Sequence, residues 1–267
     1  MVDKNVYDSY LAIMKEELVP AMGCTEPIAL AYGAARARET LGRMPEKILA
    51  RCSGNIVKNV RCVQIPNSGG LVGIAASVVL GAVGGDSSLN MEVLSRVTDE
   101  DRKTCRELLD KDICQVELLD SPVVLHFILE MQAGEDSVLL EIKYDHLNVT
   151  RLIHNGKVLI ETERDPDRPV AADRTLLKLS LIKEFADTVD LDDVKPMLDR
   201  QIQDNMAIAH EGMTGKYGLG IGRVIRETYD NDLLTRMRSL AAAASEARMG
   251  GCDMPVVINS GSGTQGI

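Results

Sequence analysis

The sequence has very few aromatic residues. It contains no Trp, two Phe and six Tyr among 267 residues, so aromatics make up 3% of the chain. Because 45% of the residues are nevertheless hydrophobic, the core must be built mainly from aliphatic side chains. We therefore expect a helix-rich globular chain with one large or two modest domains.

Long apolar runs and an excess of positive charge are also missing. The longest apolar run, residues 71–83, is interrupted by glycines and is too short to span a bilayer. The N-terminus has no basic segment followed by an apolar one, which predicts a cytoplasmic protein. A net charge of -10 argues against a nucleic acid or an anionic membrane as the main partner. We expect a small-molecule partner, and the sequence leaves a homo-oligomer open.

Cysteine pairs at metal-binding or redox spacing are absent. The six cysteines include no Cys-x-x-Cys pair, which predicts free thiols or isolated metal ligands rather than disulfides or a zinc finger. Three histidines, His126, His146 and His154, fall in segments expected to be strands. They lack His-x-x-x-His spacing and a carboxylate at ligand spacing, so we do not assign them to a metal.

The chain is organised around residues 20–30, where one helix stops and another starts. A helix of period 3.6 precedes Pro20, and a second helix, rich in small residues, is expected from its N-cap Thr25 to about Leu41. Cys24 therefore lies at a helix N-terminus, where unpaired amides stabilise a thiolate, the form that attacks or binds metal. The alternative is a small buried cysteine between packed helices.

Two glycine-bearing loops stand out further along. The loop of Asn67, Ser68, Gly69 and Gly70 precedes an apolar helix, so its N–H groups could bind a carboxylate or phosphate, or the loop could be a tight turn. The segment from Ser260 to Gly263 has the composition of an anion-binding nest, but no helix is expected after it. A third glycine-rich segment, residues 211–222, follows no strand, which excludes a Rossmann or Walker loop.

The predicted fold class is α+β. We expect a mainly helical body made from residues 1–88 and 169–267, interrupted at 89–168 by a small α/β unit with an antiparallel sheet. Gly54-Asn55 is read as a turn between extended segments, and Asn155-Gly156 as a hairpin turn. Within the unit, a helix capped by Thr98 is expected to pack on five strands, at 113–119, 123–131, 137–144, 147–154 and 157–162. A linker is expected at residues 165–169.

Taken together, five motifs resemble the L-cysteine desulfidase family, which is related to the α chain of iron–sulfur L-serine dehydratases. They occur in the family's order at residues 22–30, 66–71, 212–216, 247–251 and 259–266. The resemblance implies a [4Fe–4S] cluster held by three cysteines and α,β-elimination of L-cysteine to sulfide, ammonia and pyruvate without pyridoxal phosphate. Cys24 matches the first cluster ligand. The other two belong to a C-terminal continuation that this chain lacks, so we expect a truncated chain without an intact cluster and with doubtful activity.

Site roles follow from the resemblance and the loop chemistry together. The three segments around Cys24, Asn67 and Ser260 are predicted to converge on one cleft. The expected substrate-binding residues are Thr25, Asn67, Ser68, Gly69, Gly70, Ser260, Gly261, Ser262 and Gly263. Candidates for the base are Ser260, Ser262, Lys216 and Glu26, each with a structural alternative as a cap or a solvated surface group. Two other functions stay open: L-serine dehydration at the same site, and amino-acid binding without catalysis.

Overall fold

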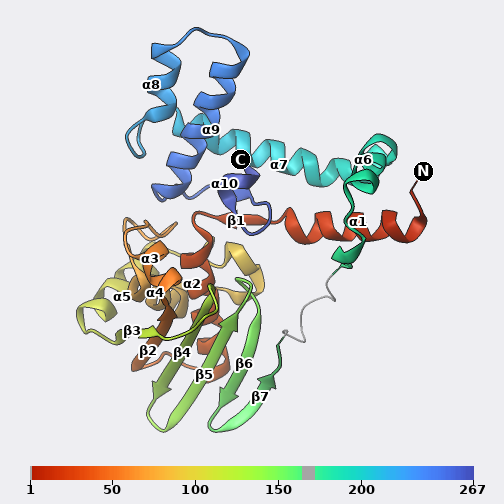
Figure 1. The fold of residues 1–267 in the computed structure, drawn as a ribbon. Coiled ribbons are helices and arrows are strands. Elements are labelled where there is room, and N and C mark those ends of the chain that lie inside the picture. Colours follow the sequence, from red (N-terminus) through yellow and green to blue (C-terminus); the bar gives the residue numbers. More distant parts are fainter. Residues whose placement is uncertain (1, 164–171) are drawn as a thin grey trace.

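The computed structural model describes residues 2–163 and 172–267. A six-stranded sheet with helices against it forms one part of the molecule, and an elongated set of helices forms the other (Figure 1). The strands are β1 (Pro20–Met22), β2 (Lys47–Ser53), β3 (Cys114–Leu119), β4 (His126–Ala133), β5 (Asp136–Lys143), β6 (Val149–His154), β7 (Lys157–Glu161) and β8 (Pro255–Val257). The α+β class is thus confirmed.

The helices fall into two groups along the chain. The first group contains α1 (Lys4–Glu17), α2 (Thr25–Leu41), α3 (Gly54–Val60), α4 (Ile74–Gly84), η1 (Ser87–Glu92) and α5 (Asp99–Asp110). The second group contains η2 (Arg174–Leu176), α6 (Leu179–Thr188), α7 (Leu191–Gly212), α8 (Ile221–Thr228), α9 (Leu233–Met249) and α10 (Gly263–Gly266). No helix in these described stretches has both the length and the apolar character needed to cross a membrane.

The sheet extends beyond the segment in which it was expected. Its strand order is β3-β2-β4-β5-β6-β7, so β2 from the first 88 residues lies between two strands of the expected insert. β2 runs parallel to β3, with Ile48 opposite Cys114, and antiparallel to β4. The expected antiparallel sheet of residues 89–168 is present in β4 to β7, but the sheet also includes β2, so it is mixed and extends beyond that segment. Buried residues alternate along β2, which gives it an apolar face like that of its neighbours.

Helix α2 packs against the sheet, and its small residues allow a close approach. A Cβ on Gly33 would lie 2.9 Å from the Phe127 ring and 3.3 Å from Leu129, both on β4. Helix α4 in turn packs on α2, and α5 packs mainly on α4. The prediction that the helix after Thr98 packs on the sheet is therefore wrong, because α2 and α4 cover the sheet in its place.

Local sequence signals differ in how well they match the structure. The capping box of Thr98 and Asp101 begins α5 as predicted, and Asn155-Gly156 forms the β6–β7 turn with positive φ at both residues. The expected turn at Gly54-Asn55 is wrong, because α3 begins there. Its buried residues Ile56 and Val60 are four apart, so they lie on one face of a helix. A short helix, α10, also follows the Ser260 loop, where none was expected.

The second group of helices packs through small residues. A Cβ on Gly212 of α7 would overlap the backbone of Ala243 on α9, and a Cβ on Gly222 of α8 would lie 2.6 Å from the Ala243 side chain. At the other end of α7, a small apolar cluster joins α1 and α6 through Val6, Tyr10, Phe185 and Val194. The predicted linker at residues 165–169 lies outside the described residues.

A two-stranded sheet connects the beginning of the chain to residues near 255. Strand β1 pairs with β8 in antiparallel fashion, with Pro20 opposite Val257 and Met22 opposite Pro255. Because α2 starts just after β1 and α9 ends just before β8, this pairing brings the N-terminus of α2 to the C-terminal end of α9. The candidate site lies at that junction.

Candidate functional site

A cavity of about 280 Å³ opens where α2, α9 and the loop before α10 meet. Its lining includes three consecutive residues at the start of α2, two at the end of α9 and a glycine-rich turn. Asn59 of α3 and His146, from the turn between β5 and β6, complete the wall. The lining residues are Cys24, Thr25, Glu26, Asn59, His146, Arg248, Met249, Gly261, Ser262 and Gly263.

Cys24 is the N-cap of α2, one residue before the predicted cap at Thr25. Its thiol is 5% exposed and lies 3.0 Å from the Met249 sulfur and 3.7 Å from Arg248 Nη1. Burial raises the pKa of the Cys24 thiol, although the Arg248 guanidinium acts in the opposite direction. This direction differs from the thiolate stabilisation that the sequence predicts, because desolvation outweighs the nearby positive charge.

Arg248 is the main site residue that the sequence reasoning missed. It is 7% exposed, and its Nη1 and Nη2 donate to the Gly23 carbonyl at 3.2 Å and to Thr264 Oγ1 at 2.8 Å. Within the described chain, Arg248 has no carboxylate within ion-pair distance, and Nε has no hydrogen-bond partner. The available signal was an arginine inside the buried small-residue face of Ala243, Ala244 and Ala247.

Glu26 presents a carboxylate that is held by two neighbours. Asn59 Nδ2 donates to Glu26 Oε1 at 2.8 Å, and Thr25 Oγ1 donates to Oε2 at 3.1 Å. Thr25 itself is buried, so its hydroxyl orients the carboxylate rather than facing solvent. A carboxylate has about four lone-pair positions, so Glu26 keeps the capacity to accept a further proton or hydrogen bond.

The glycine-rich turn before α10 forms another part of the cavity wall, through Gly261, Ser262 and Gly263. Ser262 caps α10 and accepts from Gln265 N at 3.4 Å, whereas Ser260 is exposed, donates to Asn259 Oδ1 and is not among the lining residues. Gly263 lies against Arg248, where a Cβ would come within 2.8 Å of Cδ. Gly261 lies beside the His146 ring, where a Cβ on Gly261 would lie 3.4 Å from His146 Cε1.

Two predicted segments do not line this cavity. Two side chains of α5 bond to oxygen atoms of the loop of residues 67–70: Arg102 donates to Asn67 Oδ1 at 2.6 Å, and Arg106 donates to the Gly69 carbonyl at 2.8 Å. Ser68 is buried and bonds within its own turn to Leu71. Lys216 is exposed and pairs with Glu211 at 3.1 Å. The structure thus brings together two of the three predicted segments.

The cysteines are spread over the chain. Cys52, Cys105 and Cys114 are buried with the sheet and α5, and burial raises the pKa of these thiols to about 12, 11 and 12. Cys252 is buried and bonds to Tyr217, and Cys62 is exposed. Among the described residues there is no group of three metal-ligating side chains. A [4Fe–4S] cluster needs three thiolates, so the cysteines of this chain alone do not fit one.

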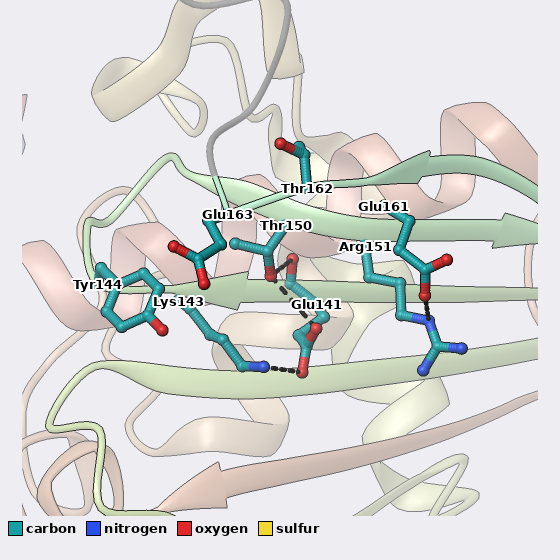
Figure 2. A pocket seen from close by; sticks show the side chains of 8 residues that line it. All are labelled: Glu141, Lys143, Tyr144, Thr150, Arg151, Glu161, Thr162 and Glu163. Atoms are coloured by element: carbon teal, nitrogen blue, oxygen red, sulfur yellow. Dashed lines mark hydrogen bonds and ion pairs between the residues drawn. The ribbon is translucent and has the colours of Figure 1, made fainter. Parts of the chain in front are cut away.

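A second hollow lies on the outer face of the sheet (Figure 2). Glu141 accepts there from Lys143 Nζ and His126 Nε2, both at 2.9 Å, and from Thr150 Oγ1 at 3.2 Å. His126 also bonds to Ser121 Oγ at 2.7 Å. Lys143 pairs with Glu141, and Arg151 pairs with Glu161, within this hollow. These pairs indicate a structural network on the sheet.

The sequence is similar to a known protein family and to several individual proteins. A family model described as "Serine dehydratase alpha chain" matches residues 88–267. A UPF0597 protein from Desulfitobacterium hafniense is 45% identical over 262 residues, which cover 98% of this chain and 61% of that protein. A UPF0597 protein from Lachnoclostridium phytofermentans is 42% identical over 262 residues, covering 98% and 63%. The chain thus spans about three fifths of these relatives. No solved structure matches significantly.

Proposed function

Since the chain belongs to the serine dehydratase alpha chain family, we propose that it carries the substrate-binding cavity of a lyase acting on a small L-amino acid. The proposed reaction is the α,β-elimination of L-cysteine to pyruvate, sulfide and ammonia, with consumption of one water. L-serine is the second candidate substrate, because the matching family is described as a serine dehydratase.

The cavity at the start of α2 is the observation that supports this proposal. It combines a thiol, a carboxylate and a buried guanidinium with the backbone of a glycine-rich turn, in about 280 Å³. That size suits a ligand of amino-acid dimensions. The lining contains groups that can accept a proton and groups that can hold an anion, which are the two requirements of elimination next to a carboxylate.

We assign the removal of the α-proton to Glu26. Its carboxylate lines the cavity and is oriented by Asn59 and Thr25. When Glu26 takes the proton, the electron pair of the Cα–H bond forms the Cα–Cβ double bond and the sulfur leaves with the electron pair of the C–S bond. The resulting aminoacrylate tautomerises to an imine, which water hydrolyses to pyruvate and ammonia. Ser262 lines the cavity as a further candidate, while Ser260 and Lys216 are farther from it.

The backbone around the cavity would hold the negative charge that develops on the substrate. The N–H groups at Thr25, Gly261 and Gly263 lie at a helix start and in a tight turn, both of which favour anions. The Ser262 N–H already donates to the Asn259 carbonyl at 2.9 Å and closes that turn. Asn67, Ser68, Gly69 and Gly70 are assigned no direct contact, because none of them lines the cavity. Their proposed role is to support the N-terminus of α2, since Pro66 packs on Gly23.

For the cofactor, we propose that Cys24 supplies one thiolate to a [4Fe–4S] cluster in a longer family member. Such a cluster would act as a Lewis acid when bound, and the reaction would not need pyridoxal phosphate. Since one cysteine cannot hold it, we expect less than one cluster per molecule of this chain.

The test compares this chain with the full-length relative from D. hafniense after anaerobic reconstitution with iron and sulfide. Pyruvate, ammonia and sulfide release are measured with L-cysteine and with L-serine. We expect release by the relative, and a loss of about 10²-fold or more when Gln replaces the residue aligned with Glu26. The matched control is Gln at the position aligned with Glu107, an exposed residue of α5. Absence of pyruvate from both substrates would leave amino-acid binding without catalysis as the better explanation.

Cys24 is tested in the same relative. We expect Ser at the aligned position to remove both acid-labile sulfide and product release, whereas Ser at the position aligned with the exposed Cys62 should change neither. Undiminished release from the first variant would exclude Cys24 from the role proposed for it.

A further inference from the structure

We propose that Arg248 is the residue that binds the carboxylate of the ligand, so that the cavity selects small α-amino acids over their amides and amines. This inference rests on the proposed function for the identity of the ligand. Four observations about Arg248 and its surroundings support the assignment of carboxylate binding to this residue.

The first observation is an uncompensated charge. Arg248 is 7% exposed, and in the described part of the chain no Asp or Glu lies within ion-pair distance of it. Transfer of an unpaired ion out of water costs several kcal/mol, so buried cations are normally paired. A buried guanidinium that lies at the wall of a cavity and has no carboxylate partner among the described residues is therefore suited to an anion that enters the cavity.

The second observation is the set of donors that remain. The Gly23 carbonyl and Thr264 Oγ1 satisfy one N–H on each terminal nitrogen. The other acceptors are sulfur atoms: Cys24 Sγ lies 3.7 Å from Nη1, and Met249 Sδ lies 3.3 Å from Nη2. Sulfur is a weak acceptor, so these N–H groups gain from exchange for carboxylate oxygens.

The third observation is that the guanidinium is fixed in place before any ligand binds. Its two strong hydrogen bonds join it to the segment before α2 and to α10, and Gly263 packs against its stem and Nε. A side chain at position 263 would need the space that Arg248 occupies. A fixed guanidinium loses little conformational entropy on binding, which favours affinity for a small ligand.

The fourth observation is the position of Arg248 relative to the reacting groups. Arg248, Cys24 and Glu26 line the same cavity of about 280 Å³. A carboxylate held by Arg248 would keep the Cα of a small amino acid within the same cavity as the Glu26 carboxylate. The Cβ atom, which carries the leaving group, is one bond from Cα and would therefore also lie inside the cavity that Cys24 lines.

The test measures binding of two matched probes to the 267-residue chain. L-alanine and L-alaninamide have the same carbon skeleton and no leaving group, and they differ in the carboxylate. Titration followed by NMR or calorimetry should show tighter binding of L-alanine to the unmodified chain by about tenfold or more, the value of a charge-assisted hydrogen bond pair. Equal binding of the two probes, or no binding of L-alanine, would overturn the proposal.

Variants identify the residue responsible. Arg248→Gln should bind both probes equally, and Arg248→Lys should keep part of the preference because it keeps the charge. The control is Arg238→Gln on the exposed face of α9, which should keep the full preference. Circular dichroism checks folding, and Arg248→Lys serves if Arg248→Gln does not fold. A full preference in either Arg248 variant would contradict the assignment.

The two experiments distinguish failure of the proposed function from failure of this inference. A preference for L-alanine that depends on Arg248, without pyruvate release by the full-length relative, would leave the binding site and remove the lyase. Pyruvate release by the relative, together with probe binding by the chain that ignores Arg248, would leave the lyase and remove the role of Arg248.

Discussion

Asn205 shows how one buried side chain positions the site. This residue of α7 is 8% exposed, and its Nδ2 donates to the carbonyls of Val257 at 3.2 Å and Gly266 at 2.8 Å. Its Oδ1 accepts from Val257 N at 2.8 Å. One amide therefore satisfies both backbone groups of a β8 residue and connects α10 to the helical part of the molecule.

Replacement of Asn205 by Ala should lower the free energy of unfolding by about 2 kcal/mol or more, because it leaves buried backbone groups without partners. Urea denaturation measures the change. Gln203→Ala, an exposed change on the same helix, is the control and should shift stability by less than about 0.5 kcal/mol. Equal effects of the two variants would mean that the Asn205 bonds are replaced by water.

Glu141 gives a prediction about pH. Burial raises its pKa, but hydrogen bonds from Lys143 and His126 outweigh burial, so the pKa lies below its ordinary value of 4.5 (Figure 2). A carboxylate with a lowered folded-state pKa stabilises the fold above the unfolded-state pKa and loses that contribution as the pH falls through the folded-state value.

Glu141→Gln should therefore destabilise the chain at pH 7, and the difference from the unmodified chain should shrink as the pH falls below about 4.5. Unfolding free energies measured at several pH values between 3 and 7 check this. Glu117→Gln, at an exposed position on β3 away from this hollow, is the control. A constant difference across that range would show that the ionised form of Glu141 is not what stabilises the network.

At the scale of elements, the contact between α2 and α4 depends on glycine. A Cβ on Gly81 of α4 would overlap the backbone of Ala31, and one on Gly85 would lie 2.9 Å from the Ala35 side chain. The small residues of both helices thus set the distance at which α4 lies on α2. This packing holds α2, and with it Cys24, against the sheet.

Gly81→Ala should lower the free energy of unfolding by about 1–3 kcal/mol through overpacking. Gly54→Ala is the matched control: Gly54 begins α3 with open space around it, so Ala should be neutral or slightly stabilising there. Chemical denaturation compares the two. If Gly81→Ala were also neutral, α4 would have to move away from α2 without cost.

Local signals in the sequence were sufficient for several elements but not for their pairing. Thr98 and Asn155-Gly156 act through neighbouring residues, so their elements could be predicted. The position of β2 between β3 and β4 could not, because it depends on contacts between residues 66 and 83 positions apart, those of Ile48 with Cys114 and with Met131. Ile56 and Val60 fit a strand or a helix by composition, and only burial of one face decides between them.

The candidate site shows the same limit. Cys24 and the Ser260 loop could be linked from their motifs, and both are found at one cavity. His146 could not be linked, because it has no distinctive neighbour in sequence and reaches the cavity only through the fold. Arg248 lies in the motif of residues 247–251, but its burial beside Cys24 depends on contacts far apart in the chain. Burial of Cys24 also reverses the direction of its pKa shift relative to the expectation for a helix N-terminus.

At the scale of the whole molecule, the helices distant from the sheet expose many apolar side chains. Around α8 and the start of α9, Leu219 is 86% exposed, Leu233 70% and Leu234 52%. Apolar surface on this scale binds hydrophobic dyes, because the dye removes that surface from water.

We expect the folded chain to bind 1-anilinonaphthalene-8-sulfonate, and the triple change of Leu219, Leu233 and Leu234 to Ser to lower the fluorescence without altering the circular dichroism. Leu118→Ser, at an exposed position on β3, is the control and should have little effect. Fluorescence that stays unchanged in the triple variant would place the dye elsewhere on the molecule.

The pairing of β1 with β8 also determines when the site can form. Cys24 and Met249 touch across 225 residues of chain, so no local folding event creates the cavity. During synthesis from the N-terminus, the sheet and α2 can fold early, whereas the site waits until β8 has emerged and paired with β1, which joins Pro20 to Val257. In refolding, binding of an amino acid should therefore be recovered after the sheet forms, as the slowest phase rather than the first.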